Sequence, residues 1–379
     1  MQVSYDIGII GAGLAGLAAA IELAEKGYKV ILIEKEHFPF HKVCGEYISN
    51  ESRNYLERLG LDMTSLGVAE IKKFSLSNEK GNQVKADLGL GGIGISRYKL
   101  DDKLAQIALD KGVILLQGLR VESIEFNVSD ETHSIHTRDG VYTARVVLGA
   151  FGKRSKLDKS MQRKFMHRAG QSVTNYVGIK YHVRLEFPED LIELHLFPGG
   201  YCGISKVEDD RYCLCYLSTS EALKERRGNI ELLEEEVLSK NPRLKERLSG
   251  AKKLYSDPLS ISQIEFGNKE TVKDHVLFIG DAAGMITPLT GNGMSMALRS
   301  SHQIVPLVDA FLRGSINRRK LEQEFSRKWK ALFAGRVSRG RQIQKLFYRQ
   351  KAVATVMQLC KVFPFLLRMI IRSTHGKPF

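Results

Sequence analysis

The chain is poor in cysteine and shows no sign of a secreted, metal-binding or repetitive protein. Its five cysteines, at positions 44, 202, 213, 215 and 360, are odd in number and lack the spacing of zinc ligands. Buried thiols on one strand face are the simplest interpretation of Cys213 and Cys215. No internal repeat, low-complexity segment, catalytic Ser-His-Asp set or metal-ligand set occurs in the sequence. We therefore predict that the protein binds no metal. An apolar strand begins within a few residues of Met1 and leaves no room for a signal peptide, so we predict a cytoplasmic protein.

The chain also lacks a segment suited to crossing a membrane. Its most apolar late stretch, residues 352–371, is interrupted by Lys361, Pro364 and Arg368. A buried membrane span tolerates such charges poorly, so we reject a transmembrane helix.

Positive charge is unevenly distributed. The net charge is +14, from 57 Lys and Arg against 43 Asp and Glu, and residues 313–379 hold 17 of the bases and 2 of the acids. The rest of the chain therefore has 57 − 17 = 40 bases and 43 − 2 = 41 acids, which is nearly neutral. The basic segment is predicted to be helical. It either caps the body of the protein or lies on an anionic bilayer at the inner face of the membrane, and sparse aromatic residues disfavour nucleic acid.

The most informative motif spans Asp6 to Glu34. An apolar strand leads into Gly11-Ala12-Gly13-Leu14-Ala15-Gly16, a helix follows, and a second apolar strand ends on Glu34. Gly11 allows a tight turn, Gly13 lets the backbone approach a pyrophosphate, and Gly16 allows close packing of helix on strand. The helix N-terminus favours phosphates, and Glu34 can accept hydrogen bonds from ribose hydroxyls. This arrangement predicts a dinucleotide site.

A second motif lies far along the chain. Residues 276–279 read as a buried strand that ends on Gly280-Asp281, and a glycine-rich loop, Pro288 to Gly293, precedes a helix from about Met294. A carboxylate at the end of a parallel strand lies where α/β sheets bind ligands. A helix N-terminus suits a group that becomes anionic, as part of a reduced flavin does. The alternative is an ordinary turn before a helix.

The order of elements predicts an α/β fold with two joined domains and a helical tail. A Rossmann-like nucleotide-binding domain is assigned to residues 1–72, 95–165 and 268–312. An inserted, mostly antiparallel β-sheet substrate domain is assigned to residues 73–94 and 166–267. Residues 313–379 form the basic helical C-terminal region. Within the substrate domain, residues 229–248 are predicted to form a helix.

Together the two motifs resemble those of the FAD-dependent enzymes related to p-hydroxybenzoate hydroxylase, with the geranylgeranyl reductase branch the best match. Lys42-Val43-Cys44-Gly45 is similar to the cysteine motif of that branch beside the flavin, and Arg97 with Leu100, Asp101 and Leu104 is similar to another of its motifs. The resemblance implies that FAD is held by Gly11, Gly13, Ala15, Gly16, Glu34, Lys35, Arg97, Val121, Gly280 and Asp281. It also implies that the isoalloxazine ring is lined by Pro288, Gly291, Asn292, Gly293 and Met294.

Several residues keep more than one interpretation. Cys44 is either a proton donor, and hence the candidate catalytic residue, or a small thiol packed near the flavin. Arg97 is a phosphate or flavin contact or a solvated surface arginine. His41 and Lys42 read as solvated loop residues, with a catalytic role as the alternative. His195, Phe197 and Tyr201 are predicted to line the substrate cavity, with packing in the core as the alternative.

The sequence departs from the family at two places. Phe151-Gly152 stands where the hydroxylases carry an Asp-Gly pair that helps bind flavin and nicotinamide. Residues 193–198, Glu-Leu-His-Leu-Phe-Pro, keep the Phe-Pro of a reductase cavity motif but lose both of its aromatic residues. The first departure weakens the hydroxylase interpretation, and the second obscures the substrate.

The predicted function is therefore an FAD-dependent oxidoreductase that reduces a C=C bond of a hydrophobic, isoprenoid- or polyketide-like small molecule. The alternative is a monooxygenase that hydroxylates an aromatic or phenolic lipid, with an external reductase as a partner. A basic binding protein that keeps FAD only as a structural element is the least favoured interpretation. No second dinucleotide motif occurs, so NADPH, ferredoxin and a quinone pool all stay open as the electron donor.

Overall fold

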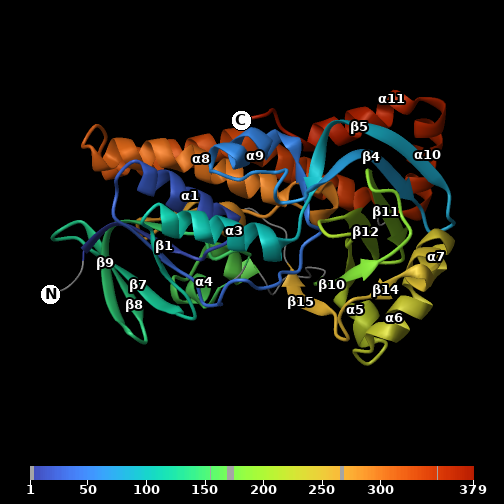
Figure 1. Cartoon of the computed structure of the whole chain (residues 1–379), viewed down its shortest axis with the longest axis horizontal. Helices are drawn as coiled ribbons and strands as arrows, with labels where there is room; N and C mark the ends of the chain where they lie inside the picture. Colours follow the sequence, from blue (N-terminus) through green and yellow to red (C-terminus); the bar gives the residue numbers. More distant parts are fainter. Residues whose placement is uncertain (1–3, 154, 169–174, 265–268, 348) are drawn as a thin grey trace.

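The fold is described from a computed structural model of the chain that covers residues 4–153, 155–168, 175–264, 269–347 and 349–379. Two β-sheets lie side by side along the long axis of the molecule, and long C-terminal helices run across both (Figure 1). This arrangement confirms the predicted fold class, a mixed α/β protein with a Rossmann-like sheet, a second sheet and a helical C-terminal region.

The first sheet has a parallel core. Its strand order is β16-β17-β9-β1-β2-β6, and β7 and β8 extend it as an antiparallel ribbon from β9. Strand β1 pairs in parallel with β9 and β2, and β2 pairs in parallel with β6. A helix connects β1 to β2 and another precedes β6, as parallel neighbours require, whereas β9 is reached through β7 and β8. The bounds are β1 Ser4–Ile10, β2 Val30–Ile33, β6 Ile114–Leu116, β7 Val121–Asn127, β8 Thr132–Thr137, β9 Gly140–Gly149, β16 Val272–Lys273 and β17 Val276–Phe278.

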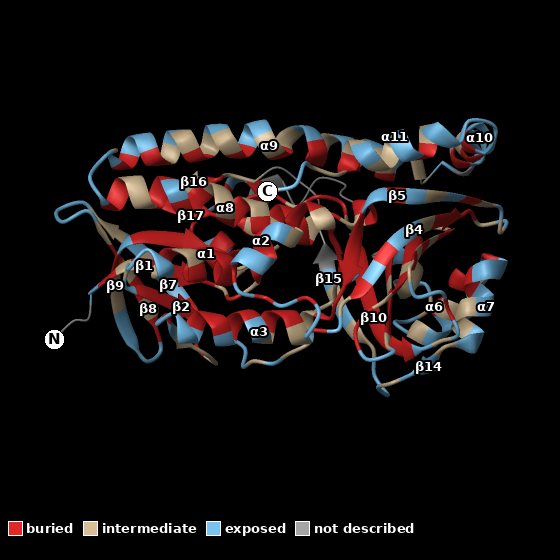
Figure 2. Ribbon diagram, turned by 45° about the horizontal axis from the view of Figure 1, so that its top comes forward, coloured by how far each residue is buried: buried red, intermediate tan, exposed pale blue. Residues whose placement is uncertain are grey.

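Helices cover this sheet and explain why its central strands are continuously apolar. All four residues of β2 are buried, as a parallel strand covered on both faces requires. Helix α1 packs against both α3 and α8, and α9 packs against α8 (Figure 2). The bounds are α1 Leu14–Glu25, α2 Arg53–Arg58, α3 Arg97–Asp110, α4 Lys156–Ser160, α8 Gly293–Leu312 and α9 Arg318–Phe347.

The second sheet is mostly antiparallel and has the order β14-β10-β13-β12-β11-β4-β5-β3, with β15 beside β10. Strand β3 and the start of β4 belong to it, although both fall in the first segment of the predicted FAD-binding domain. The bounds are β3 Tyr47–Ser49, β4 Ala69–Ser77, β5 Gln83–Gly94, β10 Tyr176–Arg184, β11 Leu191–Phe197, β12 Gly200–Lys206, β13 Tyr212–Thr219, β14 Lys252–Lys253 and β15 Leu259–Ile264.

One face of the second sheet packs on short helices. These are α5 Ser220–Lys224, α6 Ile230–Glu236 and α7 Pro242–Gly250, with the 3₁₀ turn η3 Leu238–Lys240 between the last two. The predicted single helix over residues 229–248 is therefore wrong. Asn241 caps α7 and Pro242 is its first residue, a position that proline favours because its missing N–H would have no partner there.

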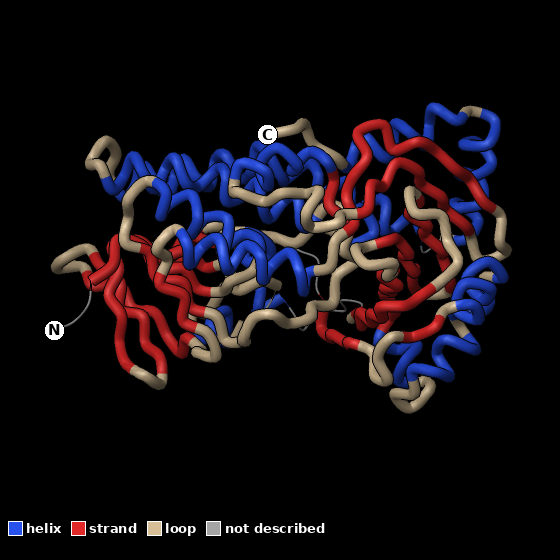
Figure 3. The backbone as a smooth tube through the Cα atoms, viewed as in Figure 1, coloured by secondary structure: helices blue, strands red, loops and turns tan. Residues whose placement is uncertain are grey.

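The other face of the second sheet is covered by the last helices, α10 Gln350–Val362 and α11 Pro364–Thr374. Their inner side chains share a core with Leu76 and Val84 of the sheet. In Figure 3 the long helix α9 leads from the first sheet to the second, where α10 and α11 follow. Four further 3₁₀ turns are η1 Asn50–Ser52, η2 Lys164–Arg168, η4 Gly280–Ala282 and η5 Pro288–Thr290.

Candidate active site

The glycine motif forms an open turn at the N-terminus of α1. Gly11 has φ +99°, and a Cβ atom there would lie 2.6 Å from the carbonyl oxygen of Ala150. A Cβ atom at Gly16 would lie 2.0 Å from the carbonyl oxygen of Gly11. At Gly13, by contrast, the nearest atom to such a Cβ is 4.0 Å away, at the Arg97 guanidinium. Gly11 and Gly16 are thus required by packing, whereas Gly13 leaves free space where a phosphate would approach.

Glu34 at the end of β2 faces this turn. Its Oε2 accepts the N–H of Ala12 at 2.8 Å and its Oε1 accepts the N–H of Glu36 at 3.2 Å. These bonds fix the carboxylate at the cavity wall, where it can also accept hydroxyl groups of a ribose. Lys35 and Val121, which the sequence resemblance assigns to FAD binding, line the same cavity.

Arg97 lies in the site rather than on the solvated surface. It begins α3, its side chain is 12% exposed, and its Nε and Nη2 donate to the Asp101 carboxylate at 2.7 Å each. Lys42 donates to Asp101 as well, at 2.8 Å. Burial alone would raise the pKa of Asp101, but Arg97 and Lys42 lower it, so Asp101 is a carboxylate that holds two cations at the cavity wall.

Cys44 lines the cavity next to this cluster. Its Sγ accepts the backbone N–H of Glu46 at 3.4 Å, and its carbonyl accepts the Cys213 thiol at 3.3 Å. Burial raises the pKa of the Cys44 thiol, against an opposing effect of Arg97. The group therefore keeps its proton at neutral pH and can donate it.

A buried charged cluster fixes the loop that carries Cys44. Glu46 is fully buried and forms an ion pair with Lys180, and its Oε2 lies 2.6 Å from His182 Nε2. Its Oε1 also accepts the N–H of Arg97 at 2.8 Å, and Lys180 donates to the carbonyl of Lys42 at 3.2 Å. Burial would raise the pKa of Glu46, but Lys180 and His182 hold it below the ordinary value. This cluster ties the loop to β10 of the second sheet.

The sequence analysis missed the Glu46 cluster. Glu46 is separated from Lys180 by 134 residues and from His182 by 136, so no local pattern joins them. The available signal was Lys180 and His182 in a strand that otherwise reads as apolar, because a buried charge needs a partner.

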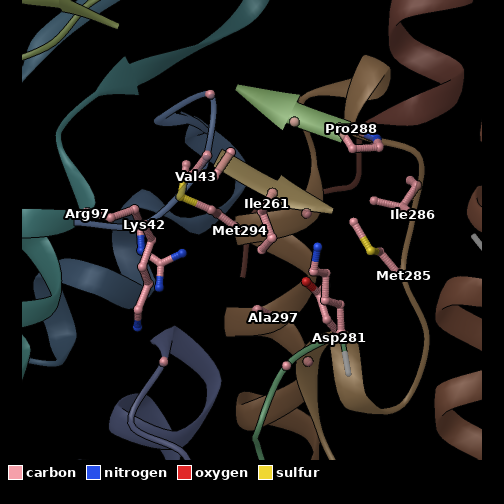
Figure 4. Close-up of a pocket in the computed structure, with 18 of the residues that line it drawn as sticks. Lys42, Val43, Arg97, Ile261, Asp281, Met285, Ile286, Pro288, Met294 and Ala297 are labelled. Carbon is pink, nitrogen blue, oxygen red and sulfur yellow. The ribbon is translucent and has the colours of Figure 1, made fainter. Parts of the chain in front are cut away.

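The loop that follows β17 supplies the opposite wall. Gly280 has φ +61°, and Asp281, Pro288, Gly291 and Met294 line the cavity together with Gly293. Figure 4 shows Arg97 and Lys42 on one side of the pocket and Asp281 on the other, with Met294 between them. Burial raises the pKa of Asp281, although Lys269 and Arg97 lower it. The two distant sequence motifs therefore meet across one cavity.

Asn292 has a different position from the one expected. It is fully buried, and its side-chain amide donates to the carbonyl of Thr374 at the end of α11. Among the described residues its Oδ1 has no partner. Asn292 therefore holds the C-terminal segment behind the loop, rather than lining the cavity beside the loop's glycines.

The cavity has a volume of about 1180 Å³, more than the ~300–1,000 Å³ of common small-molecule sites, so it has room for a cofactor and a substrate. Beyond the 285–294 loop its walls are apolar. They come from the second sheet (Phe74, Leu76, Ile192, Leu194, Leu217), the loop (Met285, Leu289) and the helical roof (Ile343, Phe347, Leu367, Ile370, Ile371).

Two of the three predicted substrate residues do not line this cavity. His195 is fully buried between Ser77 (2.7 Å from Nδ1) and Glu193 (3.1 Å from Nε2), and Phe197 packs edge-on against Tyr216 in the core under α6 and α7. Because neighbouring residues of a strand point to opposite faces, Ile192 and Leu194 of β11 line the cavity in their place. Tyr201 of β12 does line it, as predicted.

Phe151 also contributes to the wall. It lines the cavity and packs edge-on against Phe278, with 5.8 Å between ring centroids. An aromatic ring therefore occupies the position at which the hydroxylases carry an acid. No group of three or more His, Cys, Asp or Glu side chains within the described ranges is arranged to hold a metal ion.

The site fits a dinucleotide that carries a flavin. There is free space at Gly13, next to the N-terminus of α1, and the Glu34 carboxylate is held where it can meet a ribose. At the far end of the cavity a glycine-rich loop leads into α8. N–H groups at a helix N-terminus attract anionic groups such as phosphates.

Comparison with known proteins gives a family match and distant relatives. The model of a family described as "FAD binding domain" matches residues 4–328. Conditioned medium factor receptor 1 of Dictyostelium discoideum is 26% identical over 91% of this chain and 71% of its own length. Menaquinone reductase of Mycobacterium tuberculosis is 25% identical over 98% of this chain and 88% of its own length.

A third relative and a solved structure complete the comparison. Digeranylgeranylglycerophospholipid reductase 1 of Methanopyrus kandleri is 26% identical over 78% of both chains. The structure of the flavin-dependent brominase Bmp2 has a TM-score of 0.80 with 19% identity, over 98% of this chain and 93% of that one. At that identity the likeness shows a shared fold.

Proposed function

The chain belongs to the FAD binding domain family, with FAD as its cofactor, and from this premise we propose that it reduces a carbon–carbon double bond of an apolar, prenyl-like substrate. It is an oxidoreductase of the superfamily related to p-hydroxybenzoate hydroxylase, and its relatives include digeranylgeranylglycerophospholipid reductases, as the sequence resemblance implied. The reaction and the substrate class are the proposed part.

The observation that carries the proposal is the apolar chamber that adjoins the 285–294 loop. Met285 and Leu289 of this loop belong to the same apolar cluster as Leu194 and Ile370, and all four side chains line the cavity. Such walls exclude water and offer few polar partners, so they favour a hydrocarbon chain over a polar or charged substrate. The names of two relatives, a menaquinone reductase and a digeranylgeranylglycerophospholipid reductase, agree with this class.

The chain's own residues would hold the cofactor and supply a proton. The Gly11–Gly16 turn and Glu34 would hold the adenosine and phosphate part of FAD, and the 288–294 loop would face the flavin ring, which when reduced is a source of hydride. Hydride addition to one carbon of the double bond leaves the other carbon to take a proton. The protonated Cys44 thiol, which lines the cavity, would give this proton and would then be reprotonated from water.

An external donor must supply two electrons to return the cofactor to its reduced state. Reduced nicotinamide or a quinol would supply both together, and ferredoxin would supply them in two one-electron transfers. The proposal therefore covers the step in which the substrate oxidises the reduced flavin, and the electron donor stays open.

Hydroxylation is the competing proposal, since brominases and monooxygenases share this fold. Phe151 favours reduction over this alternative. Its ring packs on Phe278 and offers no carboxylate to a nicotinamide at the place where the related hydroxylases have one.

Product masses separate the two reactions. Holoenzyme reduced with dithionite would be incubated in detergent with an unsaturated prenyl lipid that has no quinone ring, because dithionite alone adds two hydrogen atoms to a quinone. The reaction would be run without oxygen and with it. We expect a product with two added hydrogen atoms without oxygen, and less of it in air, because oxygen also oxidises the reduced flavin. A product with one added oxygen atom, formed only in air, would show that the reductase proposal is wrong.

Cys44→Ser and Cys44→Ala test the proton donor. A serine hydroxyl can still relay a proton, so Cys44→Ser should retain part of the rate that Cys44→Ala loses, and the pH profile of the remaining activity should change. If both variants matched the wild type at every pH, the proton would come from another group.

A further inference from the structure

The turn between α10 and α11 exposes an unusual concentration of apolar side chains. Five large hydrophobic residues within this turn and its flanking helix ends are exposed: Leu359 (46%), Val362 (62%), Phe363 (48%), Phe365 (55%) and Met369 (60%). We refer to residues 359–369 as the α10–α11 elbow. Water-exposed aromatic and aliphatic groups so close together are typical of a surface that meets an apolar partner.

Positive charge surrounds the elbow. Lys351, Lys361, Arg368 and Arg372 are all exposed, and the sequence from residue 325 to residue 379 contains no Asp or Glu. A second protein would normally present both signs of charge to a surface, whereas an anionic bilayer presents phosphates above hydrocarbon. The combination of apolar tip and basic surround is therefore complementary to anionic lipid.

The geometry suits a surface that lies in a bilayer interface. In the part of the chain that the structure describes, no single helix is long and apolar enough to cross a membrane. The pair Lys351–Val362 and Pro364–Thr374 reaches that length and composition only together, and the two helices are bent by 116°. Pro364 at the first position of α11 produces this break, because it cannot continue α10.

The inner side of the same helices closes the substrate chamber. Leu367, Ile370 and Ile371 line the cavity, and Val353, Met357 and Cys360 pack against the second sheet beneath α10. Figure 2 shows α10 and α11 buried on the side that faces the sheet and exposed on the other. One pair of helices thus separates the apolar chamber from the apolar outer surface.

We propose that the α10–α11 elbow docks into the interface of an anionic lipid bilayer and delivers the apolar substrate from that bilayer to the chamber beneath it. The docking part rests on the elbow alone. The delivery part rests also on the proposed reductase function. The membrane contact is thereby assigned to residues 359–369. Helix α9, in the same basic region, instead packs its Trp329 against Gly284 of the FAD-binding domain.

Vesicle co-sedimentation of the holoenzyme tests the docking directly. The vesicles would be phosphatidylcholine alone or phosphatidylcholine with phosphatidylglycerol. We expect the protein to bind the anionic vesicles. The double variant Phe363→Ser/Phe365→Ser should bind them about tenfold or more weakly, because it lacks the two aromatic side chains that would enter the bilayer. Val128→Ser is the matched control, since Val128 is 82% exposed in the turn between β7 and β8.

A charge-reversal pair tests the electrostatic part. Lys361→Glu/Arg368→Glu should lose binding to anionic vesicles, and added salt should weaken wild-type binding. Lys103→Glu/Lys245→Glu changes the net charge equally at exposed positions on α3 and α7 and should leave binding near the wild-type level. Equal binding by both charge pairs would reduce the contact to a net-charge effect and overturn the proposal.

Activity assays keep this proposal separate from the reductase proposal. The Phe363→Ser/Phe365→Ser variant should reduce detergent-dissolved substrate at the wild-type rate but vesicle-embedded substrate more slowly, with unchanged flavin content and circular dichroism. If wild-type protein did not bind anionic vesicles, or if the elbow instead joined two copies in sedimentation velocity, docking would be refuted whatever the reaction is. If docking held but neither substrate were reduced, the reductase proposal alone would fail.

Discussion

The two ends of the cavity are held together by different forces. At the cofactor end, buried charges fix the backbone: Glu46 pairs with Lys180 and His182, and Asp101 pairs with Arg97 and Lys42. At the roof, α10 and α11 are held mainly by apolar side chains such as Val353 and Leu367. A charge cluster has one good arrangement, whereas apolar packing tolerates several, so the first end can position a cofactor and the second can admit a flexible substrate.

The roof has few polar attachments among the described residues, and they lie at its end. Asn292 donates to the carbonyl of Thr374, Arg339 donates to the carbonyl of Ser373 at 2.9 Å, and Arg299 donates to the carbonyl of Lys377 at 2.7 Å. These bonds anchor the end of α11 and the residues after it to α9 and to the N-terminal half of α8. The elbow at the other end of α11 carries none of these attachments, which agrees with its proposed role at a membrane.

The largest expected effect on cofactor binding comes from filling the phosphate space. Gly13 has φ −82° and ψ −178°, which any residue can adopt, so Gly13→Asp should fold. Its carboxylate would meet the pyrophosphate and should weaken FAD binding about a hundredfold or more, roughly 2.7 kcal/mol. Fluorescence titration of the apoprotein with FAD measures this, and circular dichroism checks the fold.

Gly13→Ala is the matched control, since it adds only a Cβ atom with 4.0 Å of clearance from its nearest neighbour. It should lose much less affinity. Wild-type affinity in Gly13→Asp would mean that the phosphates do not lie at this turn.

Removing the charge of Glu46 should have the largest expected effect on folding stability. Glu46→Gln leaves Lys180 buried without a carboxylate partner, and loss of one member of a buried ion pair costs about 3–5 kcal/mol of unfolding free energy. Urea denaturation measures it. Glu70→Gln removes one of the two carboxylate partners of Arg53 in an exposed ion pair and should cost less than about 1 kcal/mol. Similar costs for the two variants would contradict the proposed difference between the charged cluster and the surface.

The same cluster should appear in the acid stability of the protein. The pKa of Glu46 is lowered from its ordinary 4.5 by Lys180 and His182, against burial. The stability it contributes is therefore complete above about pH 4.5 and is lost as the pH falls below that value. Unfolding free energy measured from pH 6 downward should fall less steeply in Glu46→Gln than in the wild type. If the unfolding free energies of the wild type and Glu46→Gln fell equally steeply below pH 6, the pH dependence would come from other carboxylates.

The smallest expected effect lies at the roof. Ile370 lines the chamber, so Ile370→Phe should raise the KM for a long-chain substrate about tenfold while FAD affinity stays unchanged. Met369→Phe is the neighbouring control, because Met369 is 60% exposed on the outer side. Assays in detergent remove any contribution of vesicle binding. A matched rise in KM for both variants would show that the effect is not one of chamber shape.

The cofactor half of the site could be predicted because its signals are local. Gly11, Gly13 and Glu34 lie within one strand–helix–strand unit, and Asp281 follows directly on a buried strand. Each part of the pattern has a backbone reason, so the sequence sufficed for the sheet, the turn and the opposing loop.

The substrate half could not be predicted in the same way. His195 and Phe197 were assigned to the cavity from a motif, yet the face of a strand that points inward depends on the sheet's packing, and here Leu194 points inward. The Glu46 cluster joins segments 134 residues apart, and the roof is formed by a region whose sequence showed only amphipathic helices. These features depend on tertiary contacts that no local pattern encodes.

Anaerobic single turnover tests the central claim most directly, because it joins the cofactor end to the chamber in one measurement. Holoenzyme would be reduced without excess reductant, mixed with prenyl substrate in the absence of oxygen, and followed by flavin absorbance with product analysis. The account predicts that the oxidised flavin spectrum returns in step with one hydrogenated product per FAD. Flavin that stays reduced in the presence of every prenyl substrate and reoxidises only when air is admitted would contradict it.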